Sequence, residues 1–242
     1  MIVGLLHPGE MGAAVGCVLR ESGHDVRWAG DGRSEATRRR AEEAGLVDAG
    51  SVSALVGGAD VVLSVCPPHA ALDVARAAAG AALYVDANAV SPATARAIAA
   101  LHPRFVDGGI VGAPPRPGTT ARLYLSGAQA ALVAGLFEGD AVEPRIVPDA
   151  SAVKMTYAAW TKGSAALLLA IRDVARAYGV LDALEEEWRG STPELLERLP
   201  GAERSAAAKG WRWAGEMEEV AATFAAAGSP DGFHRAAEVF RA

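Results

Sequence analysis

The chain has 242 residues, of which 51% are hydrophobic and 21% charged, and its formal net charge is −6. This composition supplies ample apolar material for a packed core and excludes an intrinsically disordered protein. The acidic balance argues against a nucleic-acid partner, because nucleic-acid-binding domains usually carry a basic face. Two cysteines, Cys17 and Cys66, do not suggest a disulfide framework and favour a reducing compartment.

The N-terminal segment, MIVGLLHPGEMG, differs from a signal peptide because it lacks a basic region and soon becomes glycine-rich. The most apolar stretch, Ala165–Ile171, is far shorter than the ~20 residues that a membrane-spanning helix needs. We therefore expect a cytoplasmic protein without a membrane partner.

Short β-rich runs alternate with alanine-rich helical runs over residues 1–149. Strands are predicted at Ile2–Leu6, Asp25–Ala29, Val61–Val65, Leu83–Asp86, Arg104–Val106, Arg122–Ser126 and Val142–Val147, with a weaker candidate at Leu46–Val47. Helices are predicted at Met11–Glu21, Ser34–Glu43, His69–Ala79 and Pro92–Leu101, with another between the last two strands. This alternation predicts an α/β Rossmann domain, in which a doubly wound, mostly parallel sheet has helices on both faces.

From residue 150 the pattern is helical throughout. Helices are predicted at Ser151–Tyr178 (broken or strained at Gly163), Leu181–Arg189, Pro193–Leu199, Ala202–Ala226 and Pro230–Arg241. A cap residue followed by proline begins three predicted helices, at Ser91-Pro92, Thr192-Pro193 and Ser229-Pro230. We predict two domains: an NAD(P)-binding Rossmann domain at 1–149 and a small all-α substrate and dimerisation domain at 150–242. A helical domain this small often completes its core with a second subunit.

A glycine turn follows the first strand, in the sequence LHPGEMG. In the dinucleotide fingerprint G-x-G-x-x-G, Gly9 and Gly12 match the second and third glycines, whereas His7 stands at the first. Gly9 leaves the backbone open to a pyrophosphate, and Gly12 lets the following helix pack close to the strand. The predicted cofactor contacts here are His7, Pro8, Gly9, Glu10, Met11 and Gly12. The alternative is a tight strand-helix turn without a nucleotide.

The loop after the second strand contains Asp31, Arg33 and Ser34. An acidic residue in this region binds the ribose diol of NAD, whereas an arginine beside a hydroxyl suits the 2′-phosphate of NADP. Asp31 could equally cap the turn. We favour NADPH as the cofactor and keep NAD as the alternative.

Four segments share a further pattern: VGLLHPGEMG, VVLSVCPPHAA, YVDANAVSPATARAI and FVDGGIVGAPPRPGTTARLYLSG. They resemble the opening G-x-x-G-x-G-x-M-G of the β-hydroxyacid dehydrogenase family, its fourth strand and cofactor loop, its V-D-x-S-T-x-S-P block and its substrate-binding D-A-P-V-S-G-G segment. This family includes 6-phosphogluconate dehydrogenase and the imine reductases. The resemblance implies a homodimer that transfers hydride between NAD(P) and a carbonyl, alcohol or imine carbon. The final third of the chain resembles a short version of the family's helical C-terminal domain.

The resemblance also implies site residues. The helix start AVKMTYAAWTKG falls where the family has its catalytic lysine, which assigns Lys154 as the proton donor or acceptor. Cys66 and Pro67 belong to the loop over the cofactor. Asn88 lies near the expected place of the nicotinamide, with an ordinary turn residue as the alternative.

Helical spacing places Tyr157, Ala158 and Thr161 on the face of the catalytic lysine. The family usually has asparagine at the position of Ala158, where it orients the substrate, so we expect Tyr157 or Thr161 to take over this role. Lys162 could add a second cation to the substrate cleft. Trp160 is expected to pack in the core.

Val111-Gly112-Ala113 stands where the family has S-G-G, whose serine binds a substrate carboxylate. Valine cannot make this bond. Either backbone N–H groups around Gly108, Gly109 and Gly112 hold the carboxylate, or the substrate has none.

Three residues of the helical tail are further candidates for the cleft. His234 could be a second acid–base group, and Trp211 and Glu218 could close the cleft, although core packing or a dimer interface would explain the aromatic residues equally well. The histidines show no metal-ligand spacing, so we predict no metal.

These observations predict an NADPH-dependent oxidoreductase of the β-hydroxyacid dehydrogenase type that acts on a small carbonyl or alcohol through Lys154. An imine reductase is an alternative, favoured by Val111 and Ala158 but disfavoured by the lysine. A non-catalytic NADP-binding sensor or assembly protein is a second alternative, because the usual substrate anchors are missing.

Overall fold

The computed structural model describes residues 1–229. The chain forms two compact units, Met1–Lys154 and Met155–Ala242. Helix α7 (Ala150–Ala177) begins in the first unit and continues into the second. The predicted division after residue 149 falls directly before this helix, and as a domain boundary it stays a prediction.

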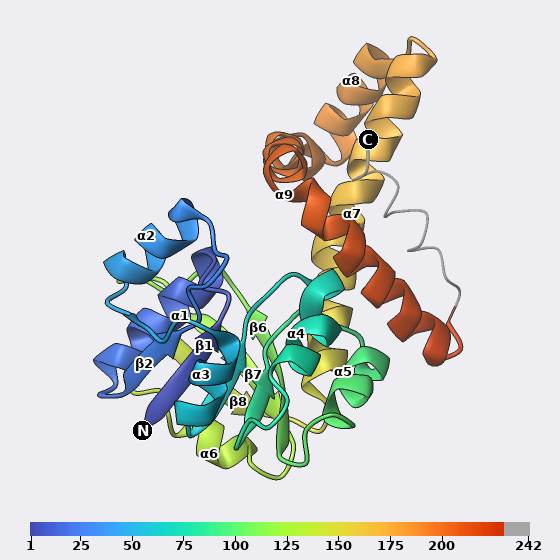
Figure 1. Ribbon diagram of the computed structural model, residues 1–242. Helices are drawn as coiled ribbons and strands as arrows, with labels where there is room; N and C mark the ends of the chain where they lie inside the picture. The colour runs from blue at the N-terminus through green and yellow to red at the C-terminus, as the bar shows by residue number, and fades with distance from the viewer. Residues whose placement is uncertain (230–242) are drawn as a thin grey trace. The chain divides into compact units, whose positions relative to one another are not determined.

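The first unit is built on one eight-stranded sheet with the strand order β3-β2-β1-β4-β5-β6-β7-β8 (Figure 1). All neighbouring strands are parallel except β6 and β7, which are antiparallel. The strands are β1 (Ile2–Leu6), β2 (Asp25–Trp28), β3 (Val47–Asp48), β4 (Val61–Ser64), β5 (Tyr84–Asp86), β6 (Phe105–Val111), β7 (Ala121–Ser126) and β8 (Val142–Ile146). This arrangement confirms the predicted Rossmann fold.

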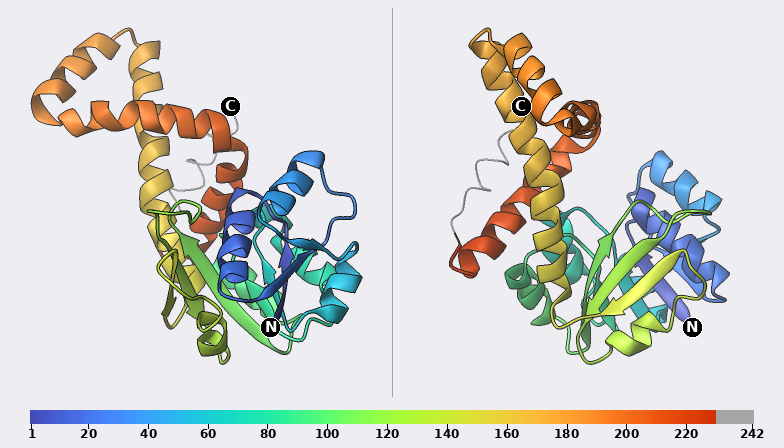
Figure 2. Two further views of the ribbon diagram at one scale, coloured as in Figure 1. Left: turned by 90° about the vertical axis from the view of Figure 1, so that its left-hand side faces the viewer. Right: turned by 180° about the vertical axis from the view of Figure 1, so that it is seen from behind.

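Helices cover both faces of the sheet (Figures 1 and 2). Apolar side chains of α1 (Glu10–Glu21), α2 (Glu35–Glu43) and α6 (Ala130–Ala134) pack on one face. Those of α3 (Val52–Gly58), α4 (Ala71–Ala77) and α5 (Pro92–Ala99) pack on the other, and a short 3₁₀ helix η1 (Pro68–Ala70) precedes α4. Successive side chains of a strand point to opposite faces of the sheet, so the strands contribute apolar residues to the cores on both faces.

Two elements of the first unit differ from the prediction. Helix α3 was not predicted, because its sequence VSALVGG is short and ends in two glycines. Strand β6 continues five residues beyond the predicted end at Val106, through Gly108 and Gly109. A β-carbon on Gly108 would lie 2.9 Å from the Asp86 carbonyl oxygen, and one on Gly109 would lie 2.8 Å from Cβ of Lys154. These glycines therefore allow close packing around the strand.

The second unit is helical, with most of α7 followed by α8 (Leu181–Ser191) and α9 (Pro193–Ala226). The predicted break in α7 at Gly163 is wrong, since the helix is continuous there. The two predicted helices around Pro200 are one helix, α9, in which Leu199 and Ala202 are buried in an apolar cluster on either side of the proline. The predicted cap at Thr192 forms no side-chain hydrogen bond. The predicted helix Pro230–Arg241 and its Ser229-Pro230 start fall mainly outside the described residues.

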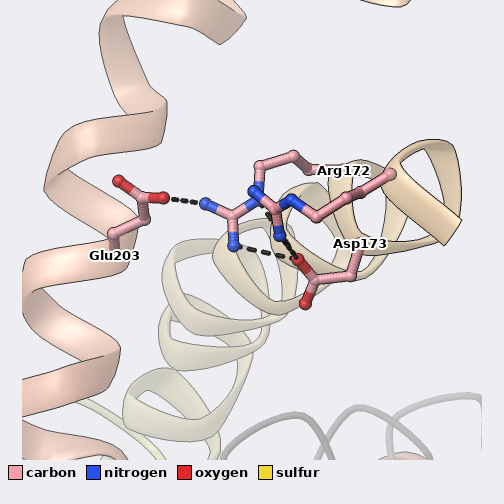
Figure 3. A network of polar contacts seen from close by, with 4 residues as sticks. Arg172, Asp173 and Glu203 are labelled. Carbon is pink, nitrogen blue, oxygen red and sulfur yellow. Dashed lines mark hydrogen bonds and ion pairs between the residues drawn. The ribbon is translucent and has the colours of Figure 1, made fainter. Parts of the chain in front are cut away.

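Apolar contacts hold α7, α8 and α9 together, and an ion pair links α7 to α9. Leu168, Leu169, Trp188, Leu199 and Ala202 form one apolar cluster, and Ala166, Ala214 and Met217 form another. Arg172 on α7 pairs with Glu203 on α9 and also with its neighbour Asp173 at 2.9 Å (Figure 3). The Arg172 side chain is only 12% exposed, and the carboxylates of Asp173 and Glu203 balance its charge.

No helix within residues 1–229 is both long and apolar enough to cross a membrane.

Gly12 and Gly9 offer a matched pair for testing the glycine turn. A β-carbon on Gly12 would lie 2.6 Å from the His7 carbonyl oxygen, whereas one on Gly9 would meet nothing within 4 Å. We expect Gly12→Ala to lower the free energy of unfolding by about 1–3 kcal/mol, because the helix must move away from the turn. Gly9→Ala should change it by less than about 0.5 kcal/mol. Urea denaturation of both variants measures this difference, and equal stabilities would contradict it.

Candidate functional site

The glycine turn lies where β1 ends and α1 begins. His7 has a φ of 67° and is the one non-glycine residue with positive φ in the described part of the chain. Its carbonyl oxygen accepts a 2.7 Å hydrogen bond from the Gly9 N–H. Glycine adopts this left-handed conformation without steric cost, which explains its use at the first fingerprint position. His7 therefore keeps the geometry of the turn while adding a side chain to it.

The other turn residues leave the start of α1 open to a ligand. The space around Gly9 is free, Glu10 is exposed, Pro8 is buried, and Met11 packs against the core. β1 and β4 lie side by side, although they are not consecutive in sequence, so the sheet changes its winding direction between them. Ligands of open α/β sheets bind in the crevice at such a point, beyond the carboxyl ends of the strands.

The loop after β2 is fixed by residues that the sequence analysis missed. Asp48 on β3 accepts hydrogen bonds from the N–H groups of Gly30 (3.0 Å) and Gly50 (2.8 Å), and Arg38 donates one to the Gly30 carbonyl oxygen (2.5 Å). Arg38 also pairs with Asp48 at 3.4 Å. An acidic residue ending the third strand could have suggested this role, but the strand itself was only a weak candidate.

The three predicted ribose-binding residues lie together on this loop. Asp31 and Ser34 are exposed, and Arg33 is half-buried. The Ser34 hydroxyl caps α2 by accepting a 3.3 Å hydrogen bond from the Thr37 N–H. Asp31 does not cap this helix, and its own N–H donates to the Gly50 carbonyl oxygen at 3.0 Å. Ser34 therefore has a structural role in addition to the one predicted for it.

A cavity of about 320 Å³ lies beside the glycine turn and reaches both the β2 loop and the start of α4. His7, Arg33, His69 and Asp73 are its polar lining residues. The Nδ1 atom of His7 is buried and has no hydrogen-bond partner. Burial, together with the nearby charge of Arg33, lowers the pKa of His7 to about 4, so the imidazole is neutral at pH 7.

The ends of β4 and β5 are joined by the Asn88 side chain. Its Oδ1 accepts a 2.5 Å hydrogen bond from the Cys66 N–H, and its Nδ2 donates to Ser64 Oγ (3.1 Å) and to Asp86. Asn88 is 2% exposed, so the amide mainly fixes the loop that contains Cys66 and Pro67. Burial raises the pKa of the Cys66 thiol to about 12, which excludes a thiolate nucleophile at neutral pH.

The start of α7 is anchored to the sheet by a buried carboxylate. Asp107 on β6 accepts hydrogen bonds from the Ser151 N–H (2.8 Å), the Ser151 hydroxyl (2.5 Å) and the Ser126 hydroxyl (3.1 Å). The Ser126 oxygen in turn accepts from the Ala150 N–H at 3.1 Å. Burial raises the pKa of Asp107, and the hydrogen bonds partly oppose this shift. The aspartate of the D-A-P-V-S-G-G pattern thus proves to be the anchor, a role that sequence reasoning missed.

This anchor places Lys154 one turn into α7. The half-buried ammonium donates a 2.6 Å hydrogen bond to the Ile110 carbonyl oxygen on β6. Gly109 permits the approach, since its missing side chain leaves room for Cβ of Lys154. The lysine therefore lies at the carboxyl end of β6. The carboxyl ends of β1, β4 and β5 lie at the same sheet edge, because these three strands and β6 are parallel.

The residues predicted to bind substrate on β6 and beyond differ in exposure. Val111 is 2% exposed, whereas Gly112 and Ala113 are exposed. Gly112 has a φ of 127°, which favours glycine. Thus the backbone of this segment, rather than the valine side chain, is open to a ligand.

The predicted residues farther along α7 have separate surroundings. Tyr157 is 46% exposed, Ala158 is fully buried, and the Thr161 hydroxyl donates to the Tyr157 carbonyl oxygen at 3.2 Å. Lys162 forms a buried ion pair with Glu216 at 2.6 Å, so its charge is already balanced within the helical unit. The prediction that Trp160 packs in the core is wrong, because it is 68% exposed.

Two further predictions concern His234 and a metal ion. His234 lies outside the described residues. Residues 1–229 contain no group of three or more His, Cys, Asp or Glu side chains that could hold a metal ion.

Asp107 can be tested against Asp149, which caps the same helix end by accepting a 2.7 Å hydrogen bond from the Ala152 N–H. We expect Asp107→Ala to lower the free energy of unfolding by about 2–4 kcal/mol, because it leaves buried donors of Ser126 and Ser151 unpaired. Asp149→Ala should cost only about 1 kcal/mol, as for an ordinary helix cap. Chemical denaturation compares the two, and a smaller loss for Asp107→Ala would refute the anchor.

Comparison with known proteins agrees with this geometry. Residues 175–242 match a domain of unknown function, DUF1932. An uncharacterized 28.5 kDa protein from Methanothermus fervidus is 31% identical over 194 residues, which cover 77% of this chain and 75% of that protein.

Two solved structures share the fold. A conserved protein of unknown function, described as structurally similar to 3-hydroxyacid dehydrogenases, has 28% identity and a TM-score of 0.69, with coverage of 100% of this chain and 96% of that one. The 3-hydroxyisobutyrate dehydrogenase of Mycobacterium tuberculosis has 19% identity and a TM-score of 0.68, with coverage of 99% and 92%. The resemblance inferred from sequence is confirmed: the chain belongs to the β-hydroxyacid dehydrogenase-like family, and its residues 175–242 match the DUF1932 domain.

Proposed function

We propose that this protein is an NADPH-dependent oxidoreductase that interconverts a small carbonyl compound and the corresponding alcohol, with Lys154 as the proton donor and acceptor. The observation that carries the proposal is the position of Lys154. Its ammonium is held against the Ile110 carbonyl oxygen at 2.6 Å, at the sheet edge where the glycine turn also lies. Family membership supports a nicotinamide cofactor and a small-molecule substrate.

The residues of the turn suit this cofactor. The open space at Gly9 and the start of α1 offer room and backbone N–H groups to a phosphate-containing ligand. The bound cofactor would supply or accept the hydride. Arg33 would bind the 2′-phosphate of NADPH, and Asp31 would bind the ribose diol of NAD if the preference were reversed.

Lys154 has the chemistry that the remaining half of the reaction needs. When a hydride is added to a carbonyl carbon, the oxygen gains negative charge and must take up a proton. The Lys154 ammonium can donate that proton, becoming a neutral amine, and in the reverse reaction the amine accepts the alcohol proton. Its hydrogen bond to the Ile110 carbonyl oxygen holds the side chain in position for both proton transfers.

Substrate contacts follow from the exposed groups near the lysine. With Val111 and Ala158 buried, we propose that backbone N–H groups of Gly112 and its neighbours hold the polar end of the substrate. Of the two hydroxyls on α7, Tyr157 is better suited to orient the substrate, because the Thr161 hydrogen is donated to its own helix.

We also propose that the protein acts as a homodimer through α7. A row of side chains follows the helix at alternating spacings of three and four residues: Tyr157, Trp160, Ser164, Leu167, Ile171, Val174 and Tyr178. Its six apolar or aromatic members are 40–80% exposed. This is the spacing with which two helices pack along a common seam, and the opposite side of α7 packs within its own unit through Leu169 and Lys162. A second copy of the same face is the occupant proposed.

The role of Lys154 predicts a large kinetic effect. A panel of oxoacids, ketones and cyclic imines, assayed with NADPH, identifies an active substrate. With that substrate, Lys154→Ala should lower kcat about a hundredfold or more. Lys209→Ala, at an exposed lysine of α9, is the matched control and should leave kcat unchanged. Unaltered turnover by Lys154→Ala, with an unchanged melting temperature, would refute the mechanism. Tight cofactor binding without turnover of any panel member would instead support a non-catalytic NADP sensor.

Cofactor preference predicts different effects on NADPH binding for Arg33 and Asp31. Calorimetry should show that the wild type binds NADPH more tightly than NADH. Arg33→Ala should weaken NADPH about tenfold or more and leave NADH nearly unchanged, because only NADPH carries the 2′-phosphate. Asp31→Asn should leave NADPH binding within about twofold of the wild type, since its carboxylate makes no bond to a phosphate. Tighter binding of NADH by the wild type would shift the ribose contact to Asp31.

The α7 seam predicts that a charge in its middle dissociates the dimer. Leu167, which is 62% exposed, would be buried between two copies, so Leu167→Glu should convert the protein to monomers at micromolar concentration. Arg176→Glu places the same charge on the other side of α7 and should leave the dimer intact. Sedimentation velocity of both variants and the wild type decides this, and a monomeric wild type would exclude the interface.

A further inference from the structure

His7 is unusual in both its backbone and its side chain. Its φ of 67° belongs to the region that glycine adopts freely, so glycine would form the same turn more easily. The imidazole also gains little inside the protein, since Nδ1 is buried without a hydrogen-bond partner. A buried polar atom of this kind is costly unless a ligand completes it. Neither the backbone conformation nor the hydrogen bonds of the described residues therefore account for a histidine at this position, which leaves the cavity that its imidazole lines as the place to look for its role.

The surroundings of His7 indicate which group this is. The imidazole lines the cavity of about 320 Å³ together with Arg33 from the β2 loop and with His69 and Asp73 from the segment after β4. Asp73 pairs with Arg76 at 2.9 Å, which balances its charge and leaves Arg33 as the cation on the β2 side. When a dinucleotide has its pyrophosphate on the glycine turn, its adenosine ribose lies between that turn and the β2 loop. His7 and Arg33 both line the cavity on this side of the turn.

We propose that His7 is a specificity-determining residue that binds the adenosine ribose of the cofactor, with the imidazole turning in the cavity so that its N–H donates a hydrogen bond to the 2′-phosphate beside Arg33. The inference rests on the proposed function, because it requires a dinucleotide at the glycine turn. A neutral imidazole carries one N–H donor, and the 2′-phosphate offers acceptor oxygens only. The histidine thus replaces the first fingerprint glycine with a side chain that distinguishes NADPH from NADH.

Two substitutions separate the side chain from the backbone. His7→Gly restores the glycine of the G-x-G-x-x-G fingerprint and keeps the turn, so the melting temperature without ligand should be equal to or higher than that of the wild type. His7→Asn retains a donor on a residue that tolerates positive φ, so it serves as the conservative control.

Calorimetric titration of the wild type and both variants with NADPH and with NADH tests the inference. His7→Gly should weaken NADPH about tenfold or more and NADH less than about threefold, because a hydrogen bond to a charged phosphate is lost. His7→Asn should bind NADPH within about threefold of the wild type.

The outcomes distinguish this inference from the proposed function. If the wild type binds NADPH but His7→Gly binds it equally or more tightly, the role of His7 is refuted and the proposed function remains. Equal weakening of NADH, or a loss in His7→Asn as large as in His7→Gly, would also refute the phosphate hydrogen bond. If the wild type binds neither nucleotide, the proposed function itself is refuted.

Discussion

The hydrogen bonds around Asp107 are the constraint on which the candidate site depends. A carboxylate is costly to bury, and this cost is visible in its raised pKa. It is offset by three short hydrogen bonds from Ser126 and Ser151, and by the positive end of the α7 helix dipole. Because α7 runs from Ala150 to Ala177, this contact fixes the first turn of the helix that carries Lys154 and then continues into the second unit.

The sequence predicted the sheet well, because its signals are local. Alternating β-rich and alanine-rich runs identified every strand, and the glycine turn identified the crevice beside β1. The differences arise where tertiary contacts override local preference. The predicted strand at Arg104–Val106 stopped before Gly108 and Gly109, and these glycines are needed where β5 and α7 approach the strand. Pro200 looked like a helix boundary, but burial of Leu199 and Ala202 in one cluster keeps α9 continuous through it.

The candidate site was less predictable, since motif positions do not reveal what a side chain contacts. The sequence identified Lys154 and His7 as unusual, but not the Ile110 contact or the left-handed backbone of His7. It also gave no indication that the charge of Lys162 is balanced by Glu216, more than fifty positions away in the chain. Such pairings depend on which helices meet, and this information is absent from the spacing of either residue.

The Cys66 thiol, half-buried in the loop after β4, has a consequence for the chemical durability of the protein. Oxidants and alkylating agents attack a thiolate, and a thiol whose pKa is about 12 is almost entirely protonated at neutral pH. The pKa of Cys17 is raised as well, chiefly by burial. With the Cys66 thiol held in the unreactive form, peroxide or a maleimide would modify it slowly, and the loop held by Asn88 would keep its shape under oxidative stress.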